Sequence, residues 1–342
     1  MSDSLFDIQR PDRRLGSVIQ ERLDNLTKPP GSLGRLESLA LEYGIMRGTP
    51  DVKLTKAAVV TFAADHGISK CGVSAYPREV TPQMVANLVS GGAAICVLCR
   101  HYGIDHFIVD VGVDFDFGDV PGLRNHKIAH GTNNFLEQDA MTREQALASL
   151  RTGAEFANGY DCMGTGEMGI GNTTASAAIL TVLGKCPIED AVGRGTGLDD
   201  EGVRRKTEVV RGAIEARRPG DDPLDVLTKL GGFEIGAIAG LILGAASRRI
   251  PVVVDGFISG AAALVATRLR PECREYLVFS HVSRERGHRR MLEILGAKPL
   301  LDLDLCLGEG TGAAIGIDLL RAAVRLYNEM ATFEEAAVSS KQ

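Results

Sequence analysis

Residues 160–183, YDCMGTGEMGIGNTTASAAILTVL, contain the pattern that decides the fold. A short apolar run, Tyr160–Gly164, leads into the glycine-rich turn Gly164–Thr174, and the alanine-rich segment Ala175–Leu183 follows. Glycine lets the backbone approach a ligand closely, and the first turn of a helix presents free N–H groups to an anion. The stretch therefore predicts a strand, a ligand-binding turn and a helix.

Five further apolar runs predict other strands of the same sheet: Ala57–Ala64, His106–Gly112, Pro251–Asp255, Tyr276–Ser280 and Leu300–Leu307. Most of them are followed by a longer stretch with helical spacing of apolar residues. Strands that alternate with helices predict an α/β fold with a mostly parallel, Rossmann-like sheet in three layers, with helices on both faces. Ligands bind such sheets at the carboxyl ends of the strands.

Two helices are expected before the first strand, over Leu15–Leu26 and Leu33–Ile45, because apolar residues recur there at helical spacing. The segment Lys28-Pro29-Pro30-Gly31-Ser32 separates them as a rigid turn. Each helix must bury its apolar face. We therefore expect the pair to pack with the C-terminal tail or against a second subunit.

The composition excludes several classes of protein. Of the 342 residues, 44% are hydrophobic and 24% charged, a balance that excludes a disordered polymer. Lys and Arg total 38 against 44 Asp and Glu, so nucleic acid is not an expected partner. The longest apolar stretches, Gly236–Ala246 and Phe257–Ala266, fall short of the ~20 residues that span a bilayer. No membrane span is expected, and the N-terminus lacks a signal-peptide pattern, so we expect a cytoplasmic protein.

Cysteine and histidine patterns give little support for a metal or redox site. Most of the seven cysteines lie in apolar runs, as reduced core residues do. Cys96 and Cys99 form a C-x-x-C pair, but no second pair completes a zinc site. Asp65-His66-Gly67 and Ser280–His288 each follow a predicted strand, where their side chains either line a pocket or bind a metal. Pocket lining or turn bonding is the favoured interpretation.

Another glycine-rich turn, Gly193–Gly197, precedes the acidic run Asp199-Asp200-Glu201. Acidic side chains at the start of a helix interact favourably with the helix dipole and repel a phosphate group there. Any phosphate contact should therefore come from the glycine loop itself. Lys206 follows about two helical turns later. Its spacing favours an exposed surface lysine over a cationic arm that reaches the loop.

The last glycine-rich turn surrounds a carboxylate. The leucines of Leu301–Leu307 alternate with Asp302, Asp304 and Cys306, and Gly308-Glu309-Gly310-Thr311-Gly312 follows. We expect a strand to end and a helix to begin at Glu309, at the ligand edge of the sheet. Because both neighbours are glycines, little bulk shields Glu309, which suits a general base. The alternative is an acid that only complements the helix dipole.

Ten segments together give the chain a family resemblance: Lys28–Leu36, Ala64–Gly67, Glu79–Ile95, Gly166–Ala178, Val192–Gly202, Gly231–Ala246, Val254–Ala263, Ser280–His288, Gly308–Ala314 and Met330–Glu335. They resemble, in the same order, the nicotinate-nucleotide:dimethylbenzimidazole phosphoribosyltransferases of cobalamin lower-ligand synthesis. The resemblance implies transfer of 5-phosphoribose from nicotinate mononucleotide to a nitrogen of 5,6-dimethylbenzimidazole. The products would be α-ribazole 5′-phosphate, with inversion at the anomeric carbon, and nicotinate; no metal or other cofactor is implied.

The resemblance also implies residue roles. Glu309 matches the catalytic base of the family, Glu167 and Lys206 match positions near the nucleotide and the reaction centre, and Gln83 matches a glutamine that reaches the base. With the glycine-rich turns, the predicted nucleotide-binding residues are Glu167, Gly169, Gly171, Asn172, Thr173, Gly195, Thr196, Gly197, Lys206 and Ser283. Asn172 and Thr173 are equally suited to capping alone. The predicted residues for the acceptor base are Ser74, Tyr76, Gln83 and Met84.

The family fold implies a large α/β domain at residues 51–326, a small helical domain from residues 1–50 with 327–342, and a homodimer. Two positions depart from the family pattern. Arg284 stands where a small residue is usual, and Gly236 replaces a commoner alanine. Arg284 would add charge near the edge of the expected pocket.

Three alternatives stay open. A phosphoribosyltransferase with a pyrophosphate donor needs two adjacent acids where this chain has Asp255-Gly256. A dinucleotide-dependent oxidoreductase is opposed because the glycines at 308, 310 and 312 lack the G-x-G-x-x-G spacing. A non-catalytic nucleotide-binding protein is opposed by the presence of Glu309.

Overall fold

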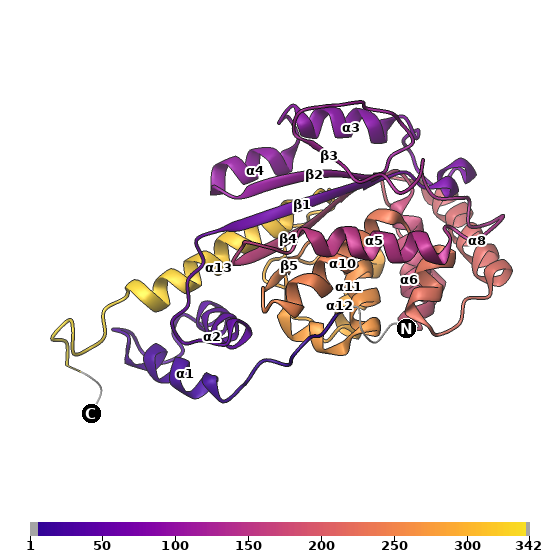
Figure 1. The fold of residues 1–342 in the computed structure, drawn as a ribbon. Coiled ribbons are helices and arrows are strands. Elements are labelled where there is room, and N and C mark those ends of the chain that lie inside the picture. Colours follow the sequence, from indigo (N-terminus) through magenta and orange to yellow (C-terminus); the bar gives the residue numbers. More distant parts are fainter. Residues whose placement is uncertain (1–5, 340–342) are drawn as a thin grey trace.

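The computed structural model describes residues 6–339, and its centre is a sheet of six parallel strands (Figure 1). The strand order is β3-β2-β1-β4-β5-β6. The strands are β1 (Ala57–Ala64), β2 (Asp105–Gly112), β3 (Leu123–Asn125), β4 (Cys162–Met168), β5 (Val252–Val254) and β6 (Leu277–Phe279). The order of neighbours along the chain reverses between β1 and β4, which is where such sheets bind ligands.

Helices cover both faces of the sheet, as the sequence predicted (Figure 1). One face carries α3 (Val80–Val89), α4 (Ala94–Tyr102) and α13 (Thr311–Glu329). The other carries α10 (Phe233–Ser247) and α11 (Phe257–Leu269). The remaining helices are α1 (Leu15–Asn25), α2 (Arg35–Arg47), α5 (Arg143–Glu155), α6 (Asn172–Leu183), α7 (Ile188–Ala191), α8 (Asp200–Arg217), α9 (Pro223–Leu230), α12 (Arg286–Ile294) and the short 3-10 helices Gly67–Cys71 and Pro271–Tyr276.

Helices α1 and α2 lie beside the sheet together with the carboxyl end of α13 and the segment that follows it (Figure 1). Helices α1 and α2 pack on each other, and α2 packs on α13. Leu26 and Thr332 form an antiparallel bridge. Between the two helices, Lys28 forms a buried ion pair with Glu37 at 2.9 Å, and Glu37 also accepts the backbone N–H groups of Gly31 and Leu33. The expected helix pair and turn are confirmed. The ends of the proposed small domain, residues 1–5 and 340–342, lie outside the described residues.

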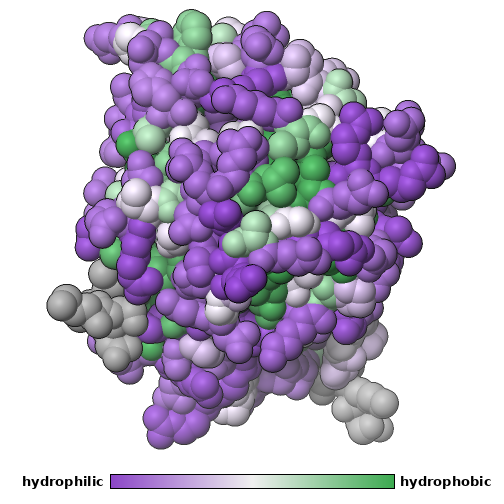
Figure 2. Space-filling view, turned by 90° about the vertical axis from the view of Figure 1, so that its right-hand side faces the viewer, coloured by the Kyte–Doolittle hydropathy of each residue, from purple (hydrophilic) through white to green (hydrophobic). Residues whose placement is uncertain are grey.

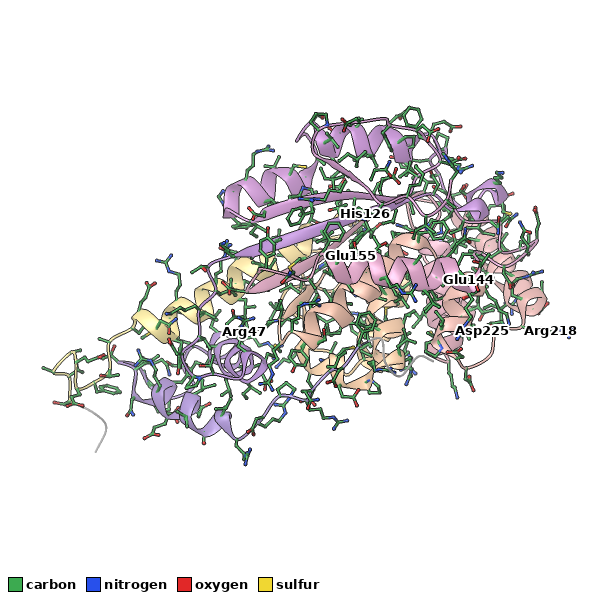
Figure 3. All side chains as sticks on the ribbon, viewed as in Figure 1. Arg47, His126, Glu144, Glu155, Arg218 and Asp225 are labelled. Carbon is green, nitrogen blue, oxygen red and sulfur yellow. The ribbon has the colours of Figure 1, made fainter. Side chains whose placement is uncertain are left out.

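Side chains also connect this helix pair to the sheet, and one of them, Arg47, is labelled in Figure 3. Arg47, at the carboxyl end of α2, lies 3.7 Å from the carboxylate of Asp161, just before β4. The same carboxylate accepts the backbone N–H groups of Thr55 and Lys56 ahead of β1. The starts of the two central strands are therefore held by one aspartate.

The structure corrects three expectations. Leu300–Leu307 is not a strand: only Leu301 of this segment forms a bridge, Asp304 has φ +54°, and Leu303 and Leu307 are exposed. A residue in the left-handed region interrupts the extended backbone that a strand needs. Strand β3 was not predicted, because its three residues carry no alternating apolar pattern. Finally, β4 extends to Met168, so the first glycines of the predicted turn lie inside the strand.

One apolar segment, Val80–Tyr102, is long and apolar enough to cross a membrane by length and composition alone. In the structure it consists of α3 and α4, of ten and nine residues, separated by a turn at residues 90–93. Each helix is shorter than the ~20 residues that a spanning helix needs.

Helices α5 and α10 approach each other so closely that backbone touches backbone. A Cβ atom at Gly153 would overlap the carbonyl of Ala237, and one at Gly240 would overlap the carbonyl of Leu150. We predict that Gly240→Ala lowers the free energy of unfolding by about 1–3 kcal/mol through overpacking. Urea denaturation measures this.

The matched control is Gly212→Ala in α8, where the new Cβ would meet only Leu136, at 3.4 Å. Its helix propensity should raise stability by about 0.5–1 kcal/mol. Equal effects of the two substitutions would contradict the close contact.

Candidate active site

A cavity of about 550 Å³ opens at the carboxyl ends of the strands. Figure 2 views this side of the molecule and shows apolar side chains gathered within a largely polar face. The predicted site residues in its wall are Glu309, Glu167, Gly169, Asn172, Thr173, Gly195, Thr196, Gly197, Ser283, Tyr76 and Met84. The end of β4, helix α3, the start of α6 and several loops thus bring together most of the residues that the sequence singled out.

Glu309 lies on a turn with an unusual backbone. It has φ +64°, and the flanking Gly308 and Gly310 have φ +88° and +103°. A left-handed conformation at a residue other than glycine costs about 1–3 kcal/mol and persists only where neighbours enforce it. Asp255 enforces it in part: its carboxylate accepts the backbone N–H groups of Gly310, Gly312 and Ala313 at 2.8–3.2 Å. The same bonds satisfy the free N–H groups at the start of α13.

The Glu309 side chain is 4% exposed and reaches the start of α4. Its Oε2 lies 3.4 Å from the backbone nitrogen of Ile95, which donates to it. Burial raises the pKa of Glu309, and the Ile95 N–H opposes this. A carboxylate whose pKa moves toward neutrality becomes a better proton acceptor at physiological pH.

Glu167, at the end of β4, provides a second buried carboxyl. Its Oε2 accepts a hydrogen bond from the Asn172 amide, and its Oε1 lies against Gly308, where a Cβ would overlap it. Burial raises the pKa of Glu167 to about 8, the charges of Asp255, Glu234 and Glu309 add to this, and the Asn172 bond opposes it. At neutral pH the group therefore holds a proton and can donate a hydrogen bond.

Lys206 is fully buried, so the interpretation from spacing as an exposed lysine is wrong. Its Nζ donates to the Thr173 hydroxyl at 2.7 Å and would lie 3.1 Å from a Cβ at Gly195. Burial lowers its pKa to about 8, and Glu285 opposes the shift. Lys206 therefore lies behind the two glycine-rich turns and contacts the cavity wall through Thr173. A role near the nucleotide, which the resemblance implied, stays a prediction.

Only some of the residues predicted to bind the acceptor base line the cavity. Tyr76 and Met84 line the cavity, whereas Gln83 is exposed and Ser74 is not in the wall. The Ser74 hydroxyl instead lies 3.0 Å from that of Thr196, which joins the two loops across the opening. Gly171, at the start of α6, also lies outside the wall.

Sequence reasoning missed several apolar residues of the cavity: Val80, Ile170, Phe257, Ile258 and Leu307. Phe257 and Ile258 follow Gly256, and their position directly after a predicted strand was an available signal. His281 lines the cavity, whereas His66 is fully buried against Glu234 at 2.6 Å. Within residues 6–339, no group of three His, Cys, Asp or Glu side chains is placed to hold a metal ion.

Comparison with known proteins places the chain in a family. Residues 8–338 match the family described as phosphoribosyltransferase. The nicotinate-nucleotide–dimethylbenzimidazole phosphoribosyltransferase of Geobacter sp. (strain M21) is 51% identical over 346 residues, which cover 99% of each chain. The chain belongs to this phosphoribosyltransferase family.

Two further relatives agree. The enzyme of the same name from Chlorobaculum tepidum is 52% identical over 343 residues, 98% of this chain and 97% of the relative. The crystal structure of CobT from Thermus thermophilus has a TM-score of 0.92 at 46% identity and covers 96% of this chain and 100% of that one. The predicted α/β fold and the family are confirmed.

The two departures from the family pattern have different surroundings. A Cβ at Gly236 would overlap the Ser149 hydroxyl in the α5–α10 contact, so this phosphoribosyltransferase needs glycine there. Arg284 is exposed and lines a neighbouring cavity with Arg194, Arg204 and Arg286. Its charge therefore lies beside the site, outside the main cavity wall.

The raised pKa of Glu167 predicts a pH dependence of stability. The unfolded chain loses this proton near pH 4.5 and the folded protein near pH 8, so this contribution to stability is complete below pH 4.5 and is lost as pH rises through about 8. Glu167→Gln cannot ionise. We predict that its thermal midpoint, relative to the parent protein, rises steadily over this range in scanning calorimetry.

Glu21→Gln, at an exposed position of α1, is the control and should give a constant difference. A constant difference for Glu167→Gln as well would mean that Glu167 is already ionised in the folded protein.

Proposed function

We propose that the protein transfers 5-phosphoribose from nicotinate mononucleotide to a ring nitrogen of 5,6-dimethylbenzimidazole. The products are α-ribazole 5′-phosphate and nicotinate. One observation carries the proposal: the buried carboxylate of Glu309 lies in one cavity with a polar wall at the start of α6 and an apolar wall that includes Tyr76 and Met84. The polar wall suits a phosphorylated ribose, and the apolar wall suits a flat aromatic base.

The chemistry requires a base at this place. One nitrogen of the acceptor attacks C1′ of the ribose, and the bond from C1′ to the nicotinate ring nitrogen breaks with its electron pair on that nitrogen. The nicotinate ring is cationic while it is glycosylated, so it leaves as a neutral pyridine nitrogen. The other acceptor nitrogen must then lose its proton, and Glu309 takes it.

The remaining site residues have roles that follow from the wall of the cavity on which they lie. Asn172, Thr173 and the 195–197 loop offer backbone and hydroxyl groups to the phosphate, and Lys206 supplies positive charge from behind Thr173. Glu167 keeps Asn172 in place and donates from its protonated carboxyl toward the ribose. The roles of Gly169, Gly171, Ser283, Ser74 and Gln83 remain predictions.

The geometry also favours the nucleotide donor over a pyrophosphate donor. Asp255 is fully engaged with the start of α13, and glycine occupies the next position. A magnesium pyrophosphate group would need a free pair of acids there.

The test is a turnover assay with nicotinate mononucleotide and dimethylbenzimidazole in the presence of a chelator. Chromatography should show nicotinate and α-ribazole 5′-phosphate in equal amounts. Glu309→Gln should lower kcat by roughly 10²–10⁴-fold because it cannot accept the proton, while the thermal midpoint and nucleotide binding change little.

The control is Glu329→Gln at the exposed carboxyl end of α13, the helix that follows Glu309, and this variant should keep kcat. Turnover only with phosphoribosyl pyrophosphate and magnesium would overturn the donor assignment. Nucleotide binding without any turnover would make the protein a binding protein.

We also propose that the protein is a cytoplasmic homodimer, in which residues 1–50 and 327–342 form a small helical domain. An exposed apolar side chain on the helix pair supports an association surface there: Val18 on α1 is 51% exposed. Sedimentation equilibrium at micromolar concentration should give twice the 36.4 kDa chain mass. A single-chain mass throughout that range would contradict the dimer.

A further inference from the structure

A chain of polar groups runs behind the catalytic turn, inside the sheet. The hydroxyl of Thr61, on β1, donates to the backbone carbonyl of Glu309 at 2.9 Å. The same hydroxyl lies 2.8 Å from Nε2 of His106 on β2. Thr61 is completely buried, so no water competes for its hydrogen bonds.

The direction of each hydrogen bond follows from the chemistry of the groups. A carbonyl only accepts, so the Thr61 hydroxyl proton points to Glu309. Thr61 must then accept from His106, which places the imidazole proton on Nε2. Nδ1 is left as an acceptor and faces the Cys96 thiol of α4 at 3.7 Å. Burial lowers the pKa of His106 to about 4, so the ring is neutral and the chain of groups carries no charge.

The sheet is built to admit this contact. Thr61 is paired with Gly166 in β4, and a Cβ at Gly166 would overlap the Glu309 carbonyl. Glycine at position 166 therefore lets the catalytic turn rest directly on the two central strands. This requirement explains the glycine at position 166, inside β4.

Glu309 is thus fixed at two points. Thr61 holds its backbone carbonyl, and the Ile95 N–H holds its carboxylate. Because Glu309 has φ +64°, release of the carbonyl would let the turn relax and carry the carboxylate away from Ile95. We propose that Thr61, oriented by His106, is a positioning residue that sets the direction of the Glu309 carboxylate toward the acceptor N–H. The inference rests on the proposed function, in which Glu309 accepts that proton.

Two matched pairs of variants test the hydroxyl alone. Thr61→Val replaces the hydroxyl by a methyl group of similar size in the parent protein, and Thr61→Ala differs from Thr61→Ser only by the hydroxyl. Loss of the hydroxyl should lower kcat about 10- to 100-fold, because small misplacements of a reacting group have effects of this size. KM for nicotinate mononucleotide should stay within about threefold. Thr61→Ser should restore kcat, and if Thr61→Val does not fold, the serine and alanine pair decides.

The pH profile separates positioning from a structural role. The titratable groups around Glu309 are Glu167 at the end of β4, Cys96 in α4 and Asp255 after β5, and none of them is changed by these variants. Loss of the Ile95 contact raises the pKa of Glu309, so the acid limb of kcat should move to higher pH in Thr61→Val and Thr61→Ala. With an acceptor base whose N–H is more acidic, Thr61→Val and Thr61→Ala should lower kcat by a smaller factor.

Each outcome supports or overturns the positioning role of Thr61. A lower kcat with the shifted acid limb and rescue by serine supports the inference. The inference would be overturned if Thr61→Ser and Thr61→Ala lowered kcat equally. It would also be overturned if the folded variants kept full kcat and the acid limb of the pH profile did not move. If the parent protein turns over and Glu309→Gln is impaired while Thr61→Val is normal, only the inference fails.

If the parent protein does not turn over, the proposed function fails, and NMR titration of the Glu309 carboxyl still tests the positioning. A pKa unchanged by Thr61→Val would then overturn the inference, and a raised pKa would support it.

Discussion

The carboxylate of Asp255 is the contact on which the rest of the site depends. It accepts three backbone N–H groups at the start of α13 and so fixes both the helix and the left-handed turn that carries Glu309. Burial raises the pKa of Asp255 to about 7 even though these bonds lower it. A residue that looked like a defective pyrophosphate ligand in the sequence is therefore the cap of the longest helix in the described chain.

Burial of ionisable side chains also determines the charge around the cavity. The shifts at Glu167 and Lys206 both favour the neutral form, since each is removed from water without a strong opposite charge beside it. At neutral pH Glu167, with a pKa of about 8, is therefore mostly uncharged, whereas Lys206, with a pKa of about 8, keeps most of its positive charge. In the proposed reaction the negative charge of the phosphate further favours the protonated form of Lys206.

The sequence predicted the elements whose signal is local. Strand β1 matches its apolar run, Ala57–Ala64, and the glycines around Glu309 correctly predicted a turn that leads into a helix. The predictions from sequence were wrong where the structure of a segment, or the burial of a side chain, depends on residues far away in the chain. The leucines of Leu300–Leu307 alternate as in a strand, yet Leu301 alone among them forms a bridge, and Lys206 has a surface spacing yet is covered by the glycine-rich turns. The Thr61 contact carries no local signal, because it joins residues 61 and 309 through the sheet.

The bridge between Leu26 and Thr332 has a consequence for how the chain folds. It joins residues 306 positions apart (332 − 26), so it closes almost the whole chain into one loop. Contacts of such separation form only after the intervening segments have ordered, since the entropy of loop closure must be offset by structure already present. Helix α13 begins beside Glu309 and ends beside this bridge, so it spans the distance between the cavity and the contact that closes the loop. We therefore expect the turn that carries Glu309 to become ordered late in folding, together with the closing of this loop.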